Sequence, residues 1–405
     1  MSADTLFERI AAYENRADPY PLYAELRETG VAPQRDGSYL VGTYHEIVTL
    51  LHDPRVSSDL RNRSDPRSIP EFRRKERQPS FIGYDDPEHD RLRRLAMRPF
   101  GPPHSPGRVD ALRADITRIA GELVDGFREK ERFDVVADFA YPLPVTVICR
   151  LLGVPHADIP RVRGWTNEII ASIDLTPGEN SGHTPESGLE ARLAMGEYIG
   201  DLVDLRRTDP SDDLLSALVH DTGPDGRLTR DELMATGTLL LIAGHETTVN
   251  LIANGALTLL RLPDAYRLLR DRPELLPGAV EELLRYEPPV QLLPQRTPLA
   301  DLDIADVTVP RGAPLILVLA SGNRDPRRFT DPDRFDPLRE DNQHLGFGSG
   351  VHNCFGAPLA RVEAQIALHA LLPRLATLHP VEDPPPYRRS PILRGPRSLL
   401  VERTG

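Results

Sequence analysis

The chain has 405 residues and a formal net charge of −12, and this acidic balance argues against a nucleic acid as partner. Its two cysteines, Cys149 and Cys354, fit a reducing cytoplasm better than a secreted, disulfide-linked fold. No linker, low-complexity stretch or internal repeat divides the sequence, and the N-terminus lacks the basic and apolar segments of a signal peptide or membrane anchor. We therefore expect one large helical domain over residues 1–405, in the cytoplasm and without a membrane contact.

The first element with an unusual pattern is a charged helix over about residues 87–98. His89 and Arg93 lie four residues apart and share one face of such a helix. The opposite face carries three arginines, Arg91, Arg94 and Arg98. A solvated, arginine-rich helix explains the second face but not the first.

The most regular helix signal begins at Thr229. Thr229 and Glu232 match a capping box, and the apolar pattern continues to about Leu260, a length of about 45 Å at 1.5 Å per residue. The centre, residues 239–252, is apolar nearly all round, which predicts a helix buried on every side.

This helix has polar residues and a glycine at its centre, in the run 243–248, Ala-Gly-His-Glu-Thr-Thr. Such breaks of the local rule tend to mark functional sites. Two other interpretations compete with a functional one. A transmembrane span is long enough, but His, Glu and Asn lie in mid-span. A kinked core helix with satisfied polar groups is the second alternative.

Two further motifs follow the long helix. Glu282 and Arg285 lie one helical turn apart, a spacing that usually forms an ordinary surface ion pair. A glycine-rich loop over residues 347–356 then places Cys354 just ahead of a helix that begins near residue 357.

The setting of Cys354 suits a thiolate. Free backbone N–H groups and the dipole at a helix N-terminus stabilise the ionised sulfur. Gly350 and Gly356 would leave room for a planar group, and Phe347 could cover the sulfur from the side. A buried apolar cysteine and a nucleophile with His and Asn partners are the alternatives. Cys149, at the end of an apolar run, is predicted to be core.

The motifs at 89–93, 243–248, 282–285, 323–326, 332–335 and 347–356, in this order, resemble those of the cytochrome P450 family, in particular its soluble bacterial members, over nearly the whole chain. The resemblance implies a mainly α fold with small β-sheets. It also implies haem b between the long central helix and the cysteine loop, with Cys354 as the axial ligand of the iron.

The resemblance assigns roles on the long helix. Ala243 and Gly244 would let the helix cross the haem face. The Thr247 hydroxyl would hydrogen-bond to bound dioxygen or its ordered water, and Glu246 would start a proton relay. Thr248, about 100° further round the helix, is expected to support them.

The resemblance also assigns the residues that hold the haem and its loop. The haem propionates would be bound by His89, Arg93, Arg296 and His352. Phe347, Gly348 and Gly356 would surround the cysteine. Glu282 and Arg285 would form a structural brace, with Arg334, or as an alternative Arg339, as its third member.

The implied activity is a monooxygenase that hydroxylates or epoxidises a hydrophobic small molecule with dioxygen. Two electrons would come from a ferredoxin and its reductase, since no reductase domain is expected in the chain. Arg91, Arg94 and Arg98 are predicted to dock the ferredoxin, and the protein is expected to be a monomer. Desaturation or oxidative coupling on the same scaffold stays an alternative, as does a haem-binding sensor without turnover. A peroxide-driven enzyme is disfavoured by the intact Glu246–Thr247 pair.

The substrate pocket is expected to be apolar. Its walls would come from the segment before His89, the region 165–175, the long helix and two later segments. The predicted lining residues are Leu240, Ala243, Val290, Leu292, Leu293, Ile392 and Leu393. Arginine supplies all but two of the 49 basic residues, which suggests a GC-rich, actinomycete-like source, and macrolides or other polyketides, terpenoids and steroids follow as substrate classes by analogy.

Overall fold

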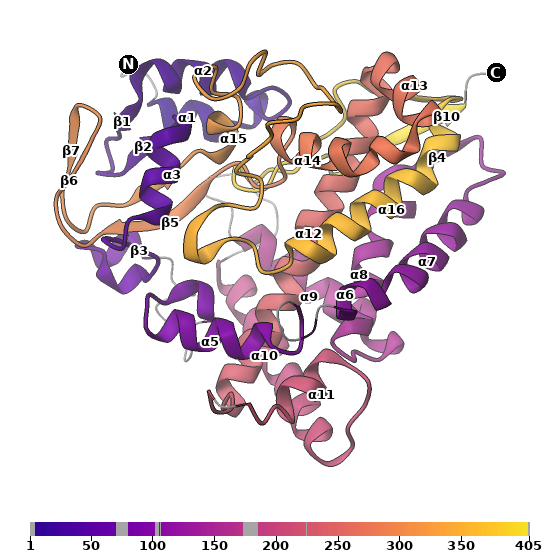
Figure 1. The fold of residues 1–405 in the computed structure, drawn as a ribbon, viewed down its shortest axis with the longest axis horizontal. Helices are drawn as coiled ribbons and strands as arrows, with labels where there is room; N and C mark the ends of the chain where they lie inside the picture. The colour runs from indigo at the N-terminus through magenta and orange to yellow at the C-terminus, as the bar shows by residue number, and fades with distance from the viewer. Residues whose placement is uncertain are drawn as a thin grey trace.

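The computed structural model describes residues 5–69, 80–101, 105, 107–172, 185–223 and 225–403. The described chain is mainly helical with small β-sheets, which confirms the predicted fold class. In Figure 1 the strands β1, β2, β3, β5, β6 and β7 lie at the edge near the N-terminus, β4 and β10 lie at the opposite edge near the C-terminus, and helices fill most of the space between them.

The α-helices among the described residues share a core built around one long central member. They are α1 (Leu6–Ala11), α2 (Tyr20–Thr29), α3 (Tyr44–His52), α5 (Glu88–Met97), α6 (Gly107–Ala111), α7 (Arg113–Gly126), α8 (Pro142–Leu151), α9 (Ile159–Ser172), α10 (Pro185–Thr208), α11 (Leu214–Val219), α12 (Arg230–Arg261), α13 (Pro263–Asp271), α14 (Leu276–Tyr286), α15 (Leu319–Gly322) and α16 (Ala357–Leu375).

Three small sheets complete the fold. The five-stranded sheet has the order β1 (Val31–Pro33), β2 (Tyr39–Val41), β8 (Leu315–Leu317), β5 (Leu293–Pro298) and β3 (Val56–Ser57). Within it β2 and β8 are parallel and the other neighbours antiparallel. The second sheet has the order β4 (Arg132–Asp134), β10 (Leu400–Arg403) and β9 (Leu378–Pro380), and the third is the pair β6 (Leu302–Ile304) and β7 (Val307–Val309).

The central helix α12 begins as the sequence predicts. The Thr229 hydroxyl accepts a hydrogen bond from the Glu232 amide at 3.2 Å, and the Glu232 carboxylate accepts one from the Thr229 amide at 2.7 Å, which confirms the capping box. The helix is continuous through the polar run 243–248 and ends at Arg261, one residue beyond the predicted end. In Figure 1 it passes through the middle of the molecule, with α16 alongside it.

Glycines let neighbouring helices approach α12 closely. A Cβ on Gly244 would lie 2.9 Å from the Ile148 side chain of α8, and a Cβ on Gly255 would lie 3.0 Å from the Leu283 side chain of α14. Because protein interiors are close-packed, larger residues at these positions would push the helices apart. Helix α12 also packs on α10 and α16.

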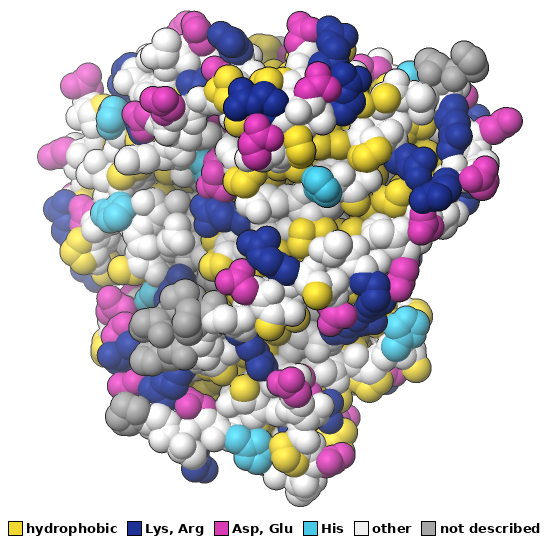
Figure 2. All heavy atoms as spheres, turned by 45° about the vertical axis from the view of Figure 1, so that its right-hand side comes forward, with side chains coloured by type: hydrophobic (Ala, Val, Ile, Leu, Met, Phe, Trp, Pro, Cys, Tyr) yellow, Lys and Arg dark blue, Asp and Glu magenta, His cyan; other side chains and the backbone are white. Residues whose placement is uncertain are grey.

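The largest apolar core surrounds α12 and includes Cys149 at 0% exposure, as predicted. Two smaller clusters lie beside the five-stranded sheet. In the described part of the chain, every helix is too short or too polar to cross a membrane. Figure 2 shows acidic and basic side chains interspersed over one face of the molecule, so the negative net charge is not gathered into one patch there.

Candidate active site

One apolar cavity brings most of the predicted site residues together. Its walls come from α12, the cysteine loop, the start of β5 and the aromatic residues on either side of α5. The lining includes both Thr247 and Cys354, from segments more than a hundred residues apart in the sequence.

Helix α12 forms one wall with side chains from successive turns. Leu240, Ala243, Gly244 and Thr247 line the cavity, as the periodicity of a helix face requires. The Thr247 hydroxyl donates a hydrogen bond to the Ala243 carbonyl at 3.0 Å. Thr248 also lines the cavity, so both threonines face it.

The cysteine loop forms a second wall. The Cys354 amide donates a hydrogen bond to the Phe347 carbonyl at 2.9 Å, and Phe347, Gly348 and Gly356 line the cavity beside the thiol. A Cβ on Gly356 would meet no atom within 4 Å. A side chain there would extend into open space, and the glycine keeps this part of the loop clear.

Gly350 serves the loop in a different way from the prediction. Its φ of +69° is a conformation that L side chains rarely adopt, and a Cβ there would lie 2.2 Å from the Leu51 carbonyl oxygen of α3. Gly350 is not part of the cavity lining. The residue is a glycine because of the turn and the close approach of α3, not because a planar group lies against it.

The Cys354 thiol is open to the cavity yet surrounded by protein atoms. Burial raises its pKa, and the backbone N–H groups of Gly356 and Ala357 and the charges of Arg93 and Arg361 oppose this effect. These groups favour the thiolate, as expected of a sulfur at a helix N-terminus. A cation bound at the sulfur would add to them.

Four basic side chains meet at one side of the cavity, and the only carboxylate within ion-pair distance of them in the described chain is Asp86, whose Oδ1 lies 3.2 Å from His89 Nδ1. The rings of His89 and His352 lie 4.0 Å apart between centroids. Arg93 and Arg296 line the cavity with His352. Three buried nitrogens, His89 Nε2, Arg93 Nη1 and His352 Nδ1, have no hydrogen-bond partner among the described residues.

Burial and mutual repulsion lower the pKa values of this group. Burial, together with the charges of Arg296, His89 and Arg93, lowers the pKa of His352 to about 3. Burial lowers the pKa of Arg296 to about 10 and, as its largest cause, lowers that of His89 as well. A buried cluster of this kind requires a negative partner. The residues therefore fit a haem whose two propionates lie among these four side chains.

Glu246 lies outside the cavity lining and is 1% exposed. Its Oε1 is 2.6 Å from Nη1 of Arg388, although the angle does not favour a hydrogen bond. Arg388 also donates from Nε to the Asn250 side chain at 3.1 Å. Arg388 comes from the C-terminal segment, and no local signal in the sequence indicates this pairing.

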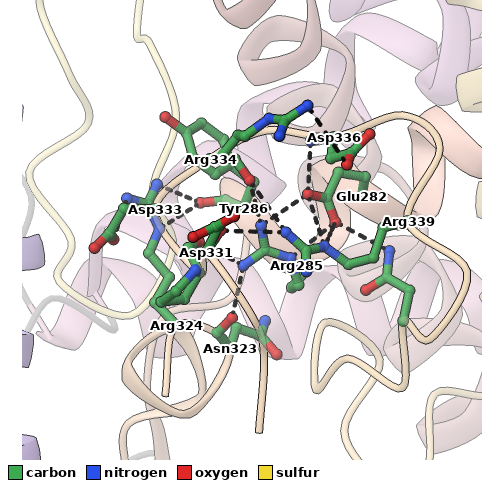
Figure 3. A network of polar contacts seen from close by, with 12 residues as sticks. Glu282, Arg285, Tyr286, Asn323, Arg324, Asp331, Asp333, Arg334, Asp336 and Arg339 are labelled. Carbon is green, nitrogen blue, oxygen red and sulfur yellow. Dashed lines mark hydrogen bonds and ion pairs between the residues drawn. The ribbon is translucent and has the colours of Figure 1, made fainter. Parts of the chain in front are cut away.

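The predicted brace joins α14 to the segment before the cysteine loop, and Figure 3 shows its geometry. Glu282 and Arg285 are both fully buried, and two hydrogen bonds of 2.7 and 2.8 Å join them. Arg285 also donates to the carbonyls of Asn323, Pro332 and Arg334. The pair thus ties α14 to the segment that leads to the cysteine loop.

The prediction of Arg334 as third member of the brace is wrong. Only the carbonyl of Arg334 takes part, and its guanidinium is exposed and turned toward Asp336. Arg339 is the third member: its Nε lies 3.2 and 3.1 Å from the two carboxylate oxygens of Glu282. The two arginines lie close in the sequence, and only the path of the loop decides which one points inward.

Four of the seven residues predicted for the substrate wall line the cavity. Leu240, Ala243, Val290 and Leu293 line the cavity. Leu292 does not, because adjacent residues of an extended segment face opposite sides; it is 0% exposed in a core cluster against which Ile392 packs. Leu393 forms a backbone bridge with Val290 but is not part of the lining. Of the region 165–175, residues 173–175 lie outside the described residues.

Four further apolar residues of the wall come from predicted segments: Phe81 and Ile82 from the segment before His89, and Leu239 and Leu251 from the long helix. Phe100 and Ile148 also line the cavity and were not predicted. Glu363 of α16 also lines the cavity, and both of its carboxylate oxygens are buried without a hydrogen-bond partner among the described residues. An acid within the apolar run of α16 was a detectable signal for Glu363. Phe100 and Ile148 had no such signal, since apolar core and pocket residues look alike in a sequence.

The predicted docking arginines do not form a free basic surface. Arg91 pairs with Glu88 and Glu232, and Arg94 lies 3.3 Å from Asp90. Arg98 is 13% exposed and pairs with Asp221 and Asp225. Each of the three arginines is paired with a carboxylate of the same chain, and their role in docking a ferredoxin stays a prediction.

Comparison with known proteins agrees with this site. The family model described as Cytochrome P450 matches residues 269–403. Cytochrome P450 monooxygenase PikC of Streptomyces venezuelae is 41% identical over 395 residues, covering 95% of this chain and 91% of that protein. Mycinamicin IV hydroxylase/epoxidase of Micromonospora griseorubida is 40% identical over 389 residues, 94% of each.

A solved structure extends the agreement to the fold. Ligand-free CYP164A2 of Mycobacterium smegmatis superimposes with a TM-score of 0.87 at 38% sequence identity, covering 98% of this chain and 99% of that one. Similarity of this extent, together with a cavity that joins a cysteine loop to a threonine on the central helix, shows that the chain belongs to the cytochrome P450 family, as a monooxygenase that binds haem iron through a cysteine thiolate.

Proposed function

We propose that haem b lies in the cavity between α12 and residues 347–356, with the Cys354 thiolate as the ligand of the iron, and that the enzyme hydroxylates or epoxidises a large hydrophobic molecule. The observation that carries the proposal is that one apolar cavity is lined by a reachable cysteine thiol, a threonine hydroxyl and three basic side chains, Arg93, Arg296 and His352, with His89 packed against His352. Cys149, the other cysteine, is enclosed in the core.

The haem, when bound, supplies an iron centre at which dioxygen is activated and an oxygen atom transferred. The chain supplies its setting. His89, Arg93, Arg296 and His352 bind the propionates and thereby orient the group. The N–H groups of Gly356 and Ala357 help to keep Cys354 ionised.

The chain also provides groups that can transfer protons on the α12 side of the cavity. The Thr247 hydroxyl, whose hydrogen is directed to the Ala243 carbonyl, has lone pairs that can accept a hydrogen bond from a water in the cavity. Glu246 holds and releases a proton on the side of the helix that faces Arg388. Arg388, 20% exposed, places this acid within reach of the surface.

The apolar walls support a hydrophobic substrate, because burying apolar surface stabilises such a ligand by about 25 cal/mol per Å². One relative is named for hydroxylation and epoxidation of mycinamicin IV, and this favours a polyketide or macrolide over the terpenoid and steroid classes. A ferredoxin and its reductase supply the two electrons near the exposed Val351 of the cysteine loop. A monomeric state, a cytoplasmic location and a single domain remain predictions.

An optical titration of the ferric protein with macrolides, steroids and terpenoids tests the proposal. We expect a low-spin thiolate haem spectrum that shifts to high spin with a macrolide, as the ligand displaces water from the iron. Cys354→Ser should lose the thiolate spectrum and turnover, whereas Cys149→Ser should keep both. A thiolate spectrum in Cys354→Ser would overturn the ligand assignment. A spin shift with steroids alone would overturn the substrate class.

A further inference from the structure

Two adjacent acids of α14 have separate partners. Glu282 points to Arg285 and Arg339, in the brace described above. Glu281, about 100° round the helix, points instead to Arg361 of α16 and to His344, three residues before the cysteine loop. The contacts of Glu281 are therefore distinct from those of the brace.

The Glu281 carboxylate binds two side chains at once. Arg361 of α16 donates to it from Nε and Nη2, both at 2.8 Å, the bidentate geometry of a strong charge-assisted pair. His344 Nε2 lies 3.1 Å from the same carboxylate, and the His344 side chain is 4% exposed. Burial opposes ionisation of Glu281, but the bonds from Arg361 and His344 outweigh it and lower its pKa to about 2.

His344 links the Glu281 carboxylate to the backbone that leads into the cysteine loop. Its Nδ1 accepts a hydrogen bond from the Gly346 amide at 3.1 Å. A neutral imidazole has one donor and one acceptor nitrogen, so Nε2 carries the hydrogen that is donated to Glu281. Gly346 itself is held against α14, since a Cβ there would lie 2.6 Å from the Leu284 carbonyl oxygen.

Arg361 links the Glu281 carboxylate to the aromatic ring of Phe347. Its guanidinium carbon lies 4.6 Å from the centroid of that ring, within cation–π range. The Phe347 carbonyl accepts the Cys354 amide at 2.9 Å, and the charge of Arg361 favours the Cys354 thiolate. Glu281 thus positions Gly346 through His344, and it also positions Arg361, whose guanidinium lies against the Phe347 ring.

On the basis of the function proposed above, we propose that Glu281 is a positioning residue for the Cys354 thiolate. Through His344 and Arg361 it fixes Phe347 against the cysteine, and through the charge of Arg361 it sets the reduction potential of the bound haem. A purely structural ion pair would contribute to stability alone. A positioning pair must also change the potential, with opposite signs for its two charges.

The direction of each shift follows from electrostatics. In Glu281→Gln the charge of Arg361 is no longer balanced, so the more negative, reduced state is favoured and the potential rises. In Arg361→Gln the cation is lost, and the potential falls. The double variant should lie between the two. Asp341→Asn is the matched control, because Asp341 forms a bidentate pair with Arg328 and makes no hydrogen bond or ion pair with the described residues 344–356.

The test measures the reduction potential of the holoenzyme and the rate at which its ferrous carbonyl complex changes from the thiolate-ligated to the thiol-ligated spectrum. We expect a positive shift and a rate about tenfold above wild type in Glu281→Gln, corresponding to about 1.4 kcal/mol, and neither change in Asp341→Asn. Arg361→Lys keeps the positive charge but loses the bidentate guanidinium geometry. The conversion rate of this variant should therefore rise, while its reduction potential stays near that of wild type.

Equal potentials in wild type, Glu281→Gln and Arg361→Gln would overturn the proposal while leaving the function intact. If Glu281→Gln does not fold, the Arg361 variants decide the same question. Failure of the proposed function is seen separately, because wild type itself would then lack the thiolate-type carbonyl spectrum.

Discussion

Glu363 places a carboxyl group in the cavity wall at 1% exposure, without a hydrogen-bond partner among the described residues. Burial raises its pKa well above the ordinary value of 4.5, which favours the neutral, protonated form in the folded protein. A neutral carboxyl group can donate a proton to a neighbour. This residue is therefore a second acid beside the cavity, on the cysteine side, whereas Glu246 lies on the α12 side.

Glu363→Gln should change how stability depends on pH. The unfolded chain ionises at Glu363 above about pH 4.5 and the folded chain does not, so wild type loses up to about 1.4 kcal/mol per pH unit above that value until the folded acid also ionises. The variant has no carboxyl group at this position. We expect the melting temperature of Glu363→Gln to exceed that of wild type at about pH 8 and to match it at about pH 5.

The control is Glu129→Gln, which removes an exposed carboxyl group and should leave the pH profile of wild type unchanged. A constant difference between Glu363→Gln and wild type across this range would mean that Glu363 is ionised in the folded protein.

At the scale of elements, the loop between α15 and α16 is held by side chains rather than by regular backbone bonding. Glu282 and Arg285 of α14, with Arg339 of the loop, form a buried network that leaves the cysteine loop little freedom. Such networks are costly to break, because removing one partner leaves another buried and unsatisfied.

Arg339→Ala should therefore be much more harmful than Arg334→Ala. Arg339 is 11% exposed and donates to Glu282 and to the Thr330 carbonyl, so its loss should reduce the free energy of unfolding by about 2–3 kcal/mol. Arg334→Ala should stay within about 0.5 kcal/mol of wild type. Chemical denaturation of both variants measures this, and equal losses would contradict the assignment of Arg339 to the brace.

What the sequence could predict depended on how local the cause was. The capping box at Thr229 and the cysteine loop ahead of α16 are set by residues a few positions apart, and both are present in the structure. The choice of Arg339 over Arg334 depends on how a loop without regular structure folds onto α14. Leu292 was wrongly predicted to line the pocket, because a shift of one residue in an extended segment turns the side chain to the opposite face of the strand.

At the scale of the whole molecule, the C-terminal segment returns to the active site. Strand β10 pairs with both β4 and β9, and the chain before it carries Arg388 to Glu246 and Asn250. Arg388 and Asn250 are 138 residues apart in the sequence. The last part of the chain thus controls the surroundings of the acid on the central helix.

Arg388→Gln should impair proton supply without affecting haem binding. It removes the cation beside Glu246, and because positioned proton transfer contributes about 10²-fold or more to a rate, we expect product per electron to fall by about tenfold. Thr247→Ala should behave in the same way, since both act on the same protons. Product and peroxide yields, with the solvent isotope effect, measure this.

Arg388→Lys keeps the positive charge and serves as the control, with coupling close to wild type. Normal coupling in Arg388→Gln would show that Glu246 works without its partner.

The two cysteines differ in a way that has a practical consequence. Cys149 is 0% exposed, and burial raises its pKa to about 12, whereas Cys354 is open to the cavity. A thiol-specific dye added to the folded protein therefore reacts rapidly with one cysteine, and this is the cysteine whose sulfur would bind the haem iron. The colour developed by a preparation counts its cofactor-free molecules, and its disappearance during reconstitution gives the stoichiometry of loading directly.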